Sequence, residues 1–340
     1  MNAVTRIGID LGKHSFHLHA QDGLGRMVFR KKLSRQQLLR TLANVPACRV
    51  VMEACAGSHW LARQLVSLGH EARLISPQWV RPFVAGGDKN DFGDAQAICE
   101  AASRPSMRFV SPRNEAQQTV SALHRIRERL VRERTATVNQ IHGFLLEFGI
   151  SLPKGAAIIR RLPAVLSHET LPARLVALVE RLRAQFRYLD EQIQQVEQEL
   201  LAALREDDRS RRLLEIPGIG PITASALAVE LGDARQFANA RQFSASIGLV
   251  PRQYSTGGKP TLLGISKRGD RNLRRLLVQC ARAVMQHADT RTDVLGAWVR
   301  ALFTRRHSNV VACALANQLA RIAWAVLARG THYQARPLAA

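Results

Sequence analysis

The sequence predicts an α/β N-terminal domain, then a long helical insert, then a mainly α C-terminal domain. Three observations predict it: short apolar segments alternate with amphipathic ones near the N-terminus, a heptad pattern occupies the middle, and apolar helices punctuated by Gly and Pro follow. The 340 residues suffice for two or three cores at ~100–200 residues each. We expect domain boundaries at 1–112, 113–207 and 208–335.

The N-terminal domain begins with three strand-like segments, RIGIDL, SFHLHAQ and RMVFRKK, with glycines at the second turn. Ser34 then stands where it can cap an amphipathic helix, QQLLRTLANV. A strand, CRVVMEA, a helix from about 58 to 68 and another strand, EARLIS, come next. After Pro77 we expect a helical turn, a glycine loop at 86–87 and a helix from Asp91. This βββαβαβα order predicts an RNase H-like fold with a mixed sheet, in which the fourth strand pairs beside the first.

Acidic residues occupy the ends of these elements. Asp10 lies in the first strand, Glu53 ends the fourth, and Asp91 and Asp94 are three residues apart on the last helix. A carboxylate in so apolar a strand is costly unless a cation or a specific partner satisfies it. We therefore expect the four acids to converge and to hold two Mg²⁺ ions about 4 Å apart, with Mn²⁺ as an alternative ion.

Two other interpretations of this region are weighed. GIDLGK also opens the phosphate loop of sugar kinases and actin-like ATPases, but the further glycine loops of those folds are absent from suitable positions. His14, His17 and His19 could suggest zinc, but only the last two share a strand face, and the acids favour a harder ion. His59 either contacts a phosphate or simply begins a helix.

The middle segment, from Asn114 to about Asp207, predicts long helices broken around Pro153 and Pro163. In its second half, apolar residues recur four and three apart, which is typical of a coiled coil. These residues are Leu175, Val179, Leu182, Phe186, Leu189, Ile193, Val196 and Leu200. The partner stays open between a second copy and an internal hairpin, in which the preceding helix would offer Val120, Leu123, Ile126 and Leu130.

The charge of the chain indicates a polyanionic partner. Lys and Arg number 49 against 27 Asp and Glu, a net charge of +22. Aromatic residues make up only 5%, which argues against binding mainly by stacked bases. We find no apolar run of ~18 residues that would span a bilayer, no signal peptide pattern, and five scattered cysteines that we expect to be reduced. We therefore expect a cytoplasmic, nucleoid-associated protein without a membrane partner.

The C-terminal domain begins with LLEIPGIGPITASALAVELG, which resembles a helix-hairpin-helix motif. Its turn would present the backbone amides of Gly218, Ile219 and Gly220 to a phosphate, although a plain helix–helix turn is the alternative.

A hydroxyl-bearing loop comes next, in which Ser255 and Thr256 precede two glycines. A serine can attack phosphorus when its proton is taken up and nearby cations stabilise the developing charge. The cations expected to contact nucleic acid here are Lys259, Lys267, Arg268, Arg271, Arg274 and Arg275.

Six motifs, taken in order, resemble those of the DEDD-type insertion-sequence transposases, also known as bridge-RNA-guided recombinases. They are GIDLGK, VVMEACAG, KNDFGDAQ, IPGIGPITA, GLVPRQYSTGGK and ISKRGDRNLRRLL. The resemblance extends from about Arg6 to Leu327. It implies a RuvC-like domain with the four acids named above, a coiled-coil insert, and a transposase domain with a nucleophilic serine. It also implies a structured noncoding bridge RNA that pairs with donor and target DNA, and a tetramer in which acids and serine come from different subunits.

The nucleophile can be placed at either of two positions. In many family members the serine directly precedes the glycine, where this chain has Thr256, and others have serine at both positions. Counting forward from Tyr254 favours Thr256, whereas counting back from Ser266 favours Ser255. We prefer Ser255, because threonine is the more hindered nucleophile.

The expected function is therefore Mg²⁺-dependent DNA strand cleavage and rejoining through a serine–DNA intermediate. The alternatives are a RuvC-type junction nuclease that uses water and a non-catalytic nucleic-acid-binding protein. Only the first uses both the acids and the hydroxyl loop.

Overall fold

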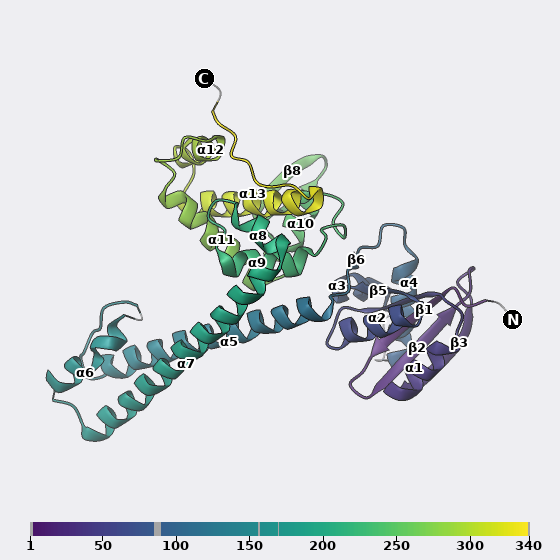
Figure 1. The fold of residues 1–340 in the computed structure, drawn as a ribbon, viewed down its shortest axis with the longest axis horizontal. Helices are drawn as coiled ribbons and strands as arrows, with labels where there is room; N and C mark the ends of the chain where they lie inside the picture. The colour runs from purple at the N-terminus through teal and green to yellow at the C-terminus, as the bar shows by residue number, and fades with distance from the viewer. Residues whose placement is uncertain (1–2, 85–89, 156, 169, 339–340) are drawn as a thin grey trace. The chain divides into compact units, whose positions relative to one another are not determined.

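The computed structural model describes residues 3–84, 90–155, 157–168 and 170–338. The chain forms two compact units, Met1–Gln117 and Gln118–Ala340 (Figure 1), and each is described by itself.

The first unit is built on a six-stranded sheet of order β3-β2-β1-β4-β5-β6. The central strand β1 runs antiparallel to β2 and parallel to β4, so the strand after the first helix does lie beside the first strand, as the element order predicted. A short strand β6, which was not predicted, pairs antiparallel with β5. The strands are β1 Arg6–Leu11, β2 Ser15–Gln21, β3 Met27–Ser34, β4 Arg49–Glu53, β5 Glu71–Ile75 and β6 Phe109–Val110.

Helices cover both faces of this sheet. Helices α1 (Arg35–Ala43) and α2 (Ser58–Ser67) pack on one face, and α3 (Pro77–Val80), the 3₁₀ turn η1 (Arg81–Phe83) and α4 (Asp91–Ser103) pack on the other. Ser34 caps α1 as expected, in a capping box with Gln37. The side chain of Asn90 accepts a hydrogen bond from Phe92 N and so begins α4. The glycine loop predicted at 86–87 lies outside the described residues.

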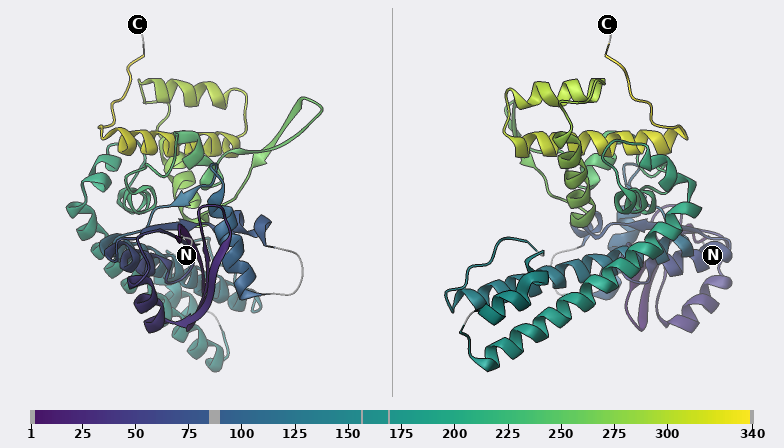
Figure 2. Two further views of the ribbon diagram at one scale, coloured as in Figure 1. Left: turned by 90° about the vertical axis from the view of Figure 1, so that its right-hand side faces the viewer. Right: turned by 60° about the vertical axis from the view of Figure 1, so that its left-hand side comes forward.

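The second unit begins with an arm of two long helices, α5 (Glu115–Leu146) and α7 (Ala173–Glu206), which lie side by side (Figure 1, Figure 2). They run antiparallel, because Arg127 pairs with Glu197 at 2.6 Å and, about two turns further along α5, Arg134 pairs with Asp190. Helix α6 (Ile158–His168) packs against both through a shared apolar cluster. Most heptad residues of α7 are buried within the chain, and Leu175 and Leu182 are partly buried, as the hairpin interpretation expects.

Two details of the predicted arm are wrong. Ile126 is 49% exposed and so does not belong to the predicted face, whereas Val120, Leu123 and Leu130 are partly buried. Pro163 lies inside α6 rather than breaking it, since a proline removes one amide donor but leaves the apolar side of the helix free to pack. Pro153 does lie between helices.

The C-terminal part of this unit is mainly helical, with one exposed hairpin. Its elements are α8 Asp208–Leu214, α9 Pro221–Leu231, α10 Ala240–Ser246, β7 Pro251–Thr256, β8 Lys259–Ile265, α11 Arg271–Gln286, α12 Val294–Phe303 and α13 Ser308–Arg329. Helix α13 is long and apolar enough to span a membrane, contrary to the sequence-based expectation that no segment is. Half of its apolar window is buried, and its buried side chains belong to the hydrophobic core of this domain.

The segment after Gly330 is held against the domain. Val294 donates its backbone N–H to the carbonyl of Arg336 at 3.0 Å. The backbone N–H of Tyr333 donates to Glu215 Oε2 at 3.1 Å, and the ring of His332 contacts the other oxygen of Glu215 at 2.7 Å. These contacts restrict the segment, whereas terminal segments without such contacts are commonly disordered.

Candidate functional site: an acidic cluster and a serine hairpin

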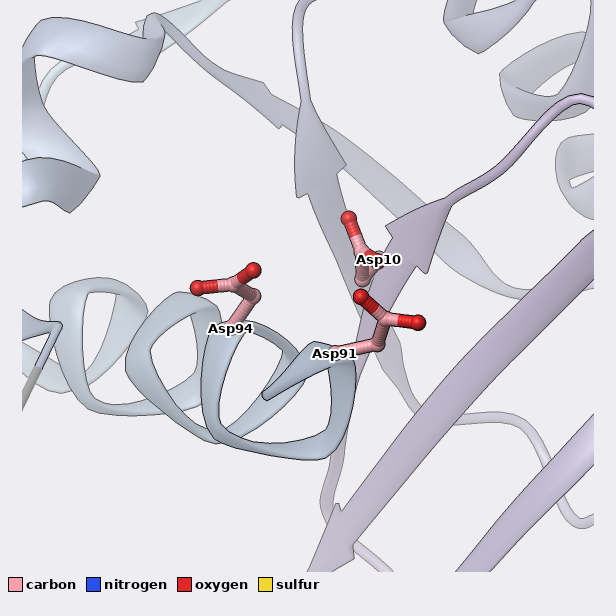
Figure 3. Close-up of side chains that lie close together, drawn as sticks. All are labelled: Asp10, Asp91 and Asp94. Carbon is pink, nitrogen blue, oxygen red and sulfur yellow. The ribbon is translucent and has the colours of Figure 1, made fainter. Parts of the chain in front are cut away.

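Three carboxylates meet at one edge of the N-terminal sheet (Figure 3). Asp10 lies near the end of β1, and Asp91 and Asp94 lie in the first turn of α4. One carboxylate oxygen of each lies within 4.8 Å of the others. The side chain of Asp10 is 28% exposed and that of Asp91 50% exposed, so the cluster opens to solvent.

A glycine brings the strand and the helix of this cluster together. Gly8 is two residues before Asp10 and therefore on the same face of β1. A Cβ atom at Gly8 would lie 2.3 Å from the carbonyl oxygen of Ala95, so α4 can lie directly on the strand only because no side chain intervenes. Further along α4, the thiol of Cys99 donates to the carbonyl of His19 at 3.1 Å, and burial raises the pKa of this thiol to about 12.

The donor set fits a hard divalent cation. Carboxylate oxygens are the ligands that Mg²⁺ and Mn²⁺ prefer, and three of them face one point here. The N-terminal end of α4 also favours negative charge at Asp91 and Asp94, because the helix dipole is positive there. A cation would offset the remaining repulsion among the three acids.

Glu53, the fourth predicted acid, lies next to this cluster but is not part of it. Val51 pairs with Gly8 across the parallel β1–β4 ladder, so Glu53, two residues later, ends on the same face as Asp10. Burial raises the pKa of the Glu53 carboxyl, and the negative charges of Asp10 and Asp94 raise it further. Among the described residues, the structure thus brings three acids to one point with Glu53 beside them.

His17 contacts the cluster, and sequence reasoning considered it only as a zinc ligand. It pairs with Asp10 across the β1–β2 ladder, and its Nδ1 lies 4.0 Å from Asp10 Oδ2 and 3.6 Å from Asp91 Oδ2. Its side chain is 6% exposed, and its ring meets that of Phe92 edge-on. The antiparallel register of the first two strands was the signal that could have identified it.

Neither His19 nor His59 joins the site. The ring of His19 accepts a hydrogen bond from Arg30 Nε at 3.2 Å and contacts Gln21, so it does not form a cluster with His17. Burial lowers the pKa of His19, and the charge of Arg30 adds to this effect. The Nδ1 atom of His59 accepts the backbone N–H of Arg113 at 3.1 Å, which holds the segment before α5.

The predicted serine loop is an exposed β-hairpin. Gly257 and Gly258 form its two-residue turn with φ of +56° and +76°, a conformation that suits glycine. Ser255 pairs with Pro260 and Thr256 with Lys259. Because side chains alternate along a strand, Ser255 and Thr256 lie on opposite faces of the hairpin, and Lys259 shares the face of Thr256.

The hydroxyl of Ser255 has a side-chain partner on its own strand. Gln253 Nε2 donates to Ser255 Oγ at 2.7 Å, and both side chains lie on the same exposed face of β7. This contact orients the serine oxygen and leaves the hydroxyl proton available for transfer to another acceptor.

One of the cations predicted to contact nucleic acid also bonds within the chain. The guanidinium of Arg274 donates to the carbonyls of Ile247 and Arg268, each at 2.8 Å, so it holds the loop against the end of α10. A Cβ at Gly248 would lie 2.3 Å from the carbonyl oxygen of Arg268, which shows how closely the two segments pack. The other predicted cations of this stretch are exposed, namely Lys259, Lys267, Arg268, Arg271 and Arg275.

The turn between α8 and α9 offers fewer amides than expected. Gly218 and Gly220 are exposed, but the N–H of Ile219 donates to the carbonyl of Ile216 at 3.0 Å, and the Ile219 side chain lies in the core. The amide of Ile219 is therefore already used inside the turn. Gly218 has φ of +77°, and a Cβ there would meet Val284 at 2.5 Å, so packing on α11 requires glycine at this position.

The acidic cluster and the serine hairpin both lie in parts of the chain that match known protein families. Residues 7–150, which include all four acids, match a family described as "Transposase", and residues 210–294, which include Ser255, match "Transposase IS116/IS110/IS902 family".

Relatives match along almost the entire chain. It is 60% identical over 331 residues to "Transposase for insertion sequence element IS1328" of Yersinia enterocolitica, covering 97% of this chain and 99% of the relative. It is 49% identical to "Probable family 20 transposase" of Pseudomonas aeruginosa, covering 97% and 99%. It is 42% identical to "Transposase for insertion sequence element IS1111A" of Coxiella burnetii, covering 98% and 92%. Transposases cut and transfer DNA strands, so this chain is an enzyme, and it belongs to the IS116/IS110/IS902 family of insertion-sequence transposases.

Proposed function

We propose that the acidic cluster and Ser255 together cut and rejoin DNA at the ends of an insertion sequence and at its target. The observation that carries this proposal is the meeting of Asp10, Asp91 and Asp94 within 4.8 Å at an open edge of the sheet. Three carboxylates this close together repel one another, and a divalent cation would offset that repulsion.

The metal would be held by Asp10, Asp91 and Asp94, with Glu53 adjacent, and Mg²⁺ or Mn²⁺ fits these donors. When bound, the ions supply positive charge that stabilises the charge developing on phosphate oxygens. His17 keeps Asp10 and Asp91 in position from within the sheet.

In the covalent step, Ser255 Oγ forms a bond to the DNA phosphorus, and the phosphodiester bond to one DNA oxygen breaks. The proton of the serine hydroxyl ends on the DNA oxygen that leaves. In the second step a DNA hydroxyl attacks the same phosphorus, the Oγ–P bond breaks, and the proton returns to Ser255. One ester bond replaces another in each step, so rejoining needs no nucleoside triphosphate.

The chain's own polar residues support this step. Gln253 orients the serine oxygen, and the exposed Lys267 and Arg268 are available to stabilise phosphate charge. Gly218 and Gly220 remain candidates for contact with the DNA backbone.

The partners are proposed from the family resemblance and the charge. A net charge of +22 suits polyanionic partners. These would be the donor DNA, the target DNA and a structured bridge RNA, and the protein would meet them in the nucleoid. The acids and the serine belong to different compact units, so a catalytic assembly has to unite them, and a tetramer that pairs acids of one subunit with the serine of another would do so.

The test is a search for the covalent intermediate. Purified chain, element-end DNA and the transcript of the flanking noncoding DNA are combined in Mg²⁺ and separated on a denaturing gel. We expect a protein–DNA adduct with the parent and with Thr256→Ala, and none with Ser255→Ala or Asp10→Asn. An adduct lost in Thr256→Ala and kept in Ser255→Ala would move the nucleophile by one residue. Cleavage without any adduct would favour a nuclease that uses water.

A further inference from the structure

A cavity of about 620 Å³ lies in the C-terminal domain. The residues that line it come after both the acids and Ser255 in the sequence. Its walls are α12, α13 and the segment 331–336, which turns back along α13 toward α12 (Figure 1). A volume between ~300 and ~1,000 Å³ is typical of pockets that hold a small molecule or a fragment of a larger one.

The lining combines flat aromatic surface with positive charge. Trp298 of α12 and Tyr333 of the tail supply the aromatic rings, and Arg321, Arg329 and Arg336 supply the guanidinium groups. No lining residue is acidic. In the part of the chain that the structure describes, none of these three arginines forms a salt bridge with Asp or Glu.

The wall formed by the tail is fixed by hydrogen bonds at both ends. Near its start, Tyr333 N–H donates to Glu215, and at its end the carbonyl of Arg336 accepts the N–H of Val294. Pro337 also forms an antiparallel bridge with Asp293. The cavity is therefore formed before any ligand arrives, which reduces the entropy cost of binding.

We propose that this cavity binds one unpaired nucleotide of a single-stranded nucleic-acid segment. The base would stack on Trp298 or Tyr333, since aromatic rings accept any base by its flat face. The adjoining phosphates would pair with the arginines, whose planar donors match phosphate oxygens. The absence of acidic lining residues favours an anionic ligand, and the aromatic pair favours a planar one. This site goes beyond strand cutting, because binding here requires neither the acids nor Ser255.

The experiment measures binding of a short fluorescent oligonucleotide to the full chain in EDTA, without cleavage, with single-stranded RNA and DNA arms. Arg321→Gln with Arg329→Gln removes two exposed charges from the cavity. Arg305→Gln with Arg306→Gln removes two exposed charges from the α12–α13 connection of the same domain and serves as the matched control. We expect the cavity pair to weaken binding about tenfold more than the control pair.

A second comparison tests the base itself. An oligonucleotide with abasic sites should bind the parent about tenfold more weakly than the intact one. Tyr333→Leu, which keeps apolar volume, should reduce this difference. Photocrosslinking of an iodouracil-containing strand should label Trp298 or Tyr333, and the arm that depends more strongly on the cavity identifies the strand as RNA or DNA.

The proposal is overturned if the two double variants weaken binding equally, or if abasic and intact strands bind the parent alike. Crosslinks confined to residues outside the cavity would also overturn it. Because the assay contains no divalent metal and breaks no bond, its failure leaves the cutting mechanism untouched, and a failed search for the serine adduct leaves this site untouched.

Discussion

Gly8 faces the backbone of α4, and the position of the acidic cluster depends on this contact. We predict that Gly8→Ala forces α4 away from β1, because the added Cβ would lie 2.3 Å from a backbone oxygen that cannot rotate away. The free energy of unfolding should fall by about 1–3 kcal/mol. Calorimetric titration with Mn²⁺ should show weaker binding.

The matched control is Gly93→Ala on the same helix. A Cβ at Gly93 would make only an ordinary contact, 3.7 Å from Asn90, and alanine favours helix more than glycine does. This variant should be as stable as the parent or slightly more so. Parental Mn²⁺ affinity in Gly8→Ala would show that the strand–helix contact does not set the geometry of the acids.

His124 predicts a pH dependence of stability. It is buried, its Nε2 lies 3.1 Å from Ser225 Oγ, and burial lowers its pKa from 6.5 to about 4. The unfolded chain therefore takes up the proton at higher pH than the folded chain. The stability that the neutral ring contributes is fully present above about pH 6.5. It is lost progressively as the pH falls from there through about 4, and the total loss in the free energy of unfolding is about 3 kcal/mol.

Urea unfolding at about pH 7 and about pH 5 measures this effect. His124→Gln can still hydrogen-bond to Ser225 but does not titrate, so the variant should lose less stability than the parent between these two pH values. Equal losses in both proteins would assign the pH dependence to other groups.

The packing of α5 against α7 predicts how substitutions of the apolar heptad residues of α7 affect stability. Leu189 and Ile193 are each 4% exposed within the chain. Leu189→Ala should therefore destabilise the arm by about 2–5 kcal/mol, whatever the assembly state. The neighbouring Tyr188 is 60% exposed, so Tyr188→Ala should change stability by less than about 0.5 kcal/mol. Thermal unfolding followed by circular dichroism compares the two, and equal melting would contradict the packing of this seam.

The elements that the sequence predicted are those with a clear periodic pattern or a strong cap. Strands β1, β2, β4 and β5 have buried residues, and Ser34 gives α1 a defined start. The β7–β8 hairpin escaped prediction because β7 is exposed on both faces, so no alternation of apolar residues marks it. Helix α5 buries the polar residues Ser121, His124 and Thr137, and no apolar pattern marks these positions in the sequence.

The site was predictable to the extent that the cost of burying charge identifies carboxylates in apolar strands. Asp10 was found in this way, and Asp91 and Asp94 by their three-residue spacing at the start of a helix, and the three meet in the structure. His17 was not, because its contact with Asp10 depends on the register between two strands, which the intervening turn sets. Arg274 appeared equivalent to its basic neighbours, and only tertiary contacts with Ile247 and Arg268 distinguish it.

For the whole molecule, the separation of acids and serine into two units predicts complementation. In the proposed mechanism, Asp10→Asn lacks a metal ligand and Ser255→Ala lacks the nucleophile, but each keeps what the other has lost. If catalytic sites form between subunits, mixing the two inactive proteins should restore part of the recombination. A plasmid recombination assay measures this, and each variant mixed with itself is the control. Complete inactivity of a mixture that still assembles would place acids and serine of one catalytic site on the same subunit.

The position of helix α13 near the end of the sequence determines when the C-terminal domain can fold during translation. The ribosome completes the N-terminal sheet and α4 early, and domains generally fold as they emerge. The last long helix to be made contributes Leu315, Leu319 and Ala323 to the core of the domain that bears Ser255. A nascent chain that has not yet released α13 can therefore display the carboxylates but lacks a folded serine domain. In the proposed mechanism, the order of synthesis thus delays attack of the serine on DNA until the polypeptide is nearly finished.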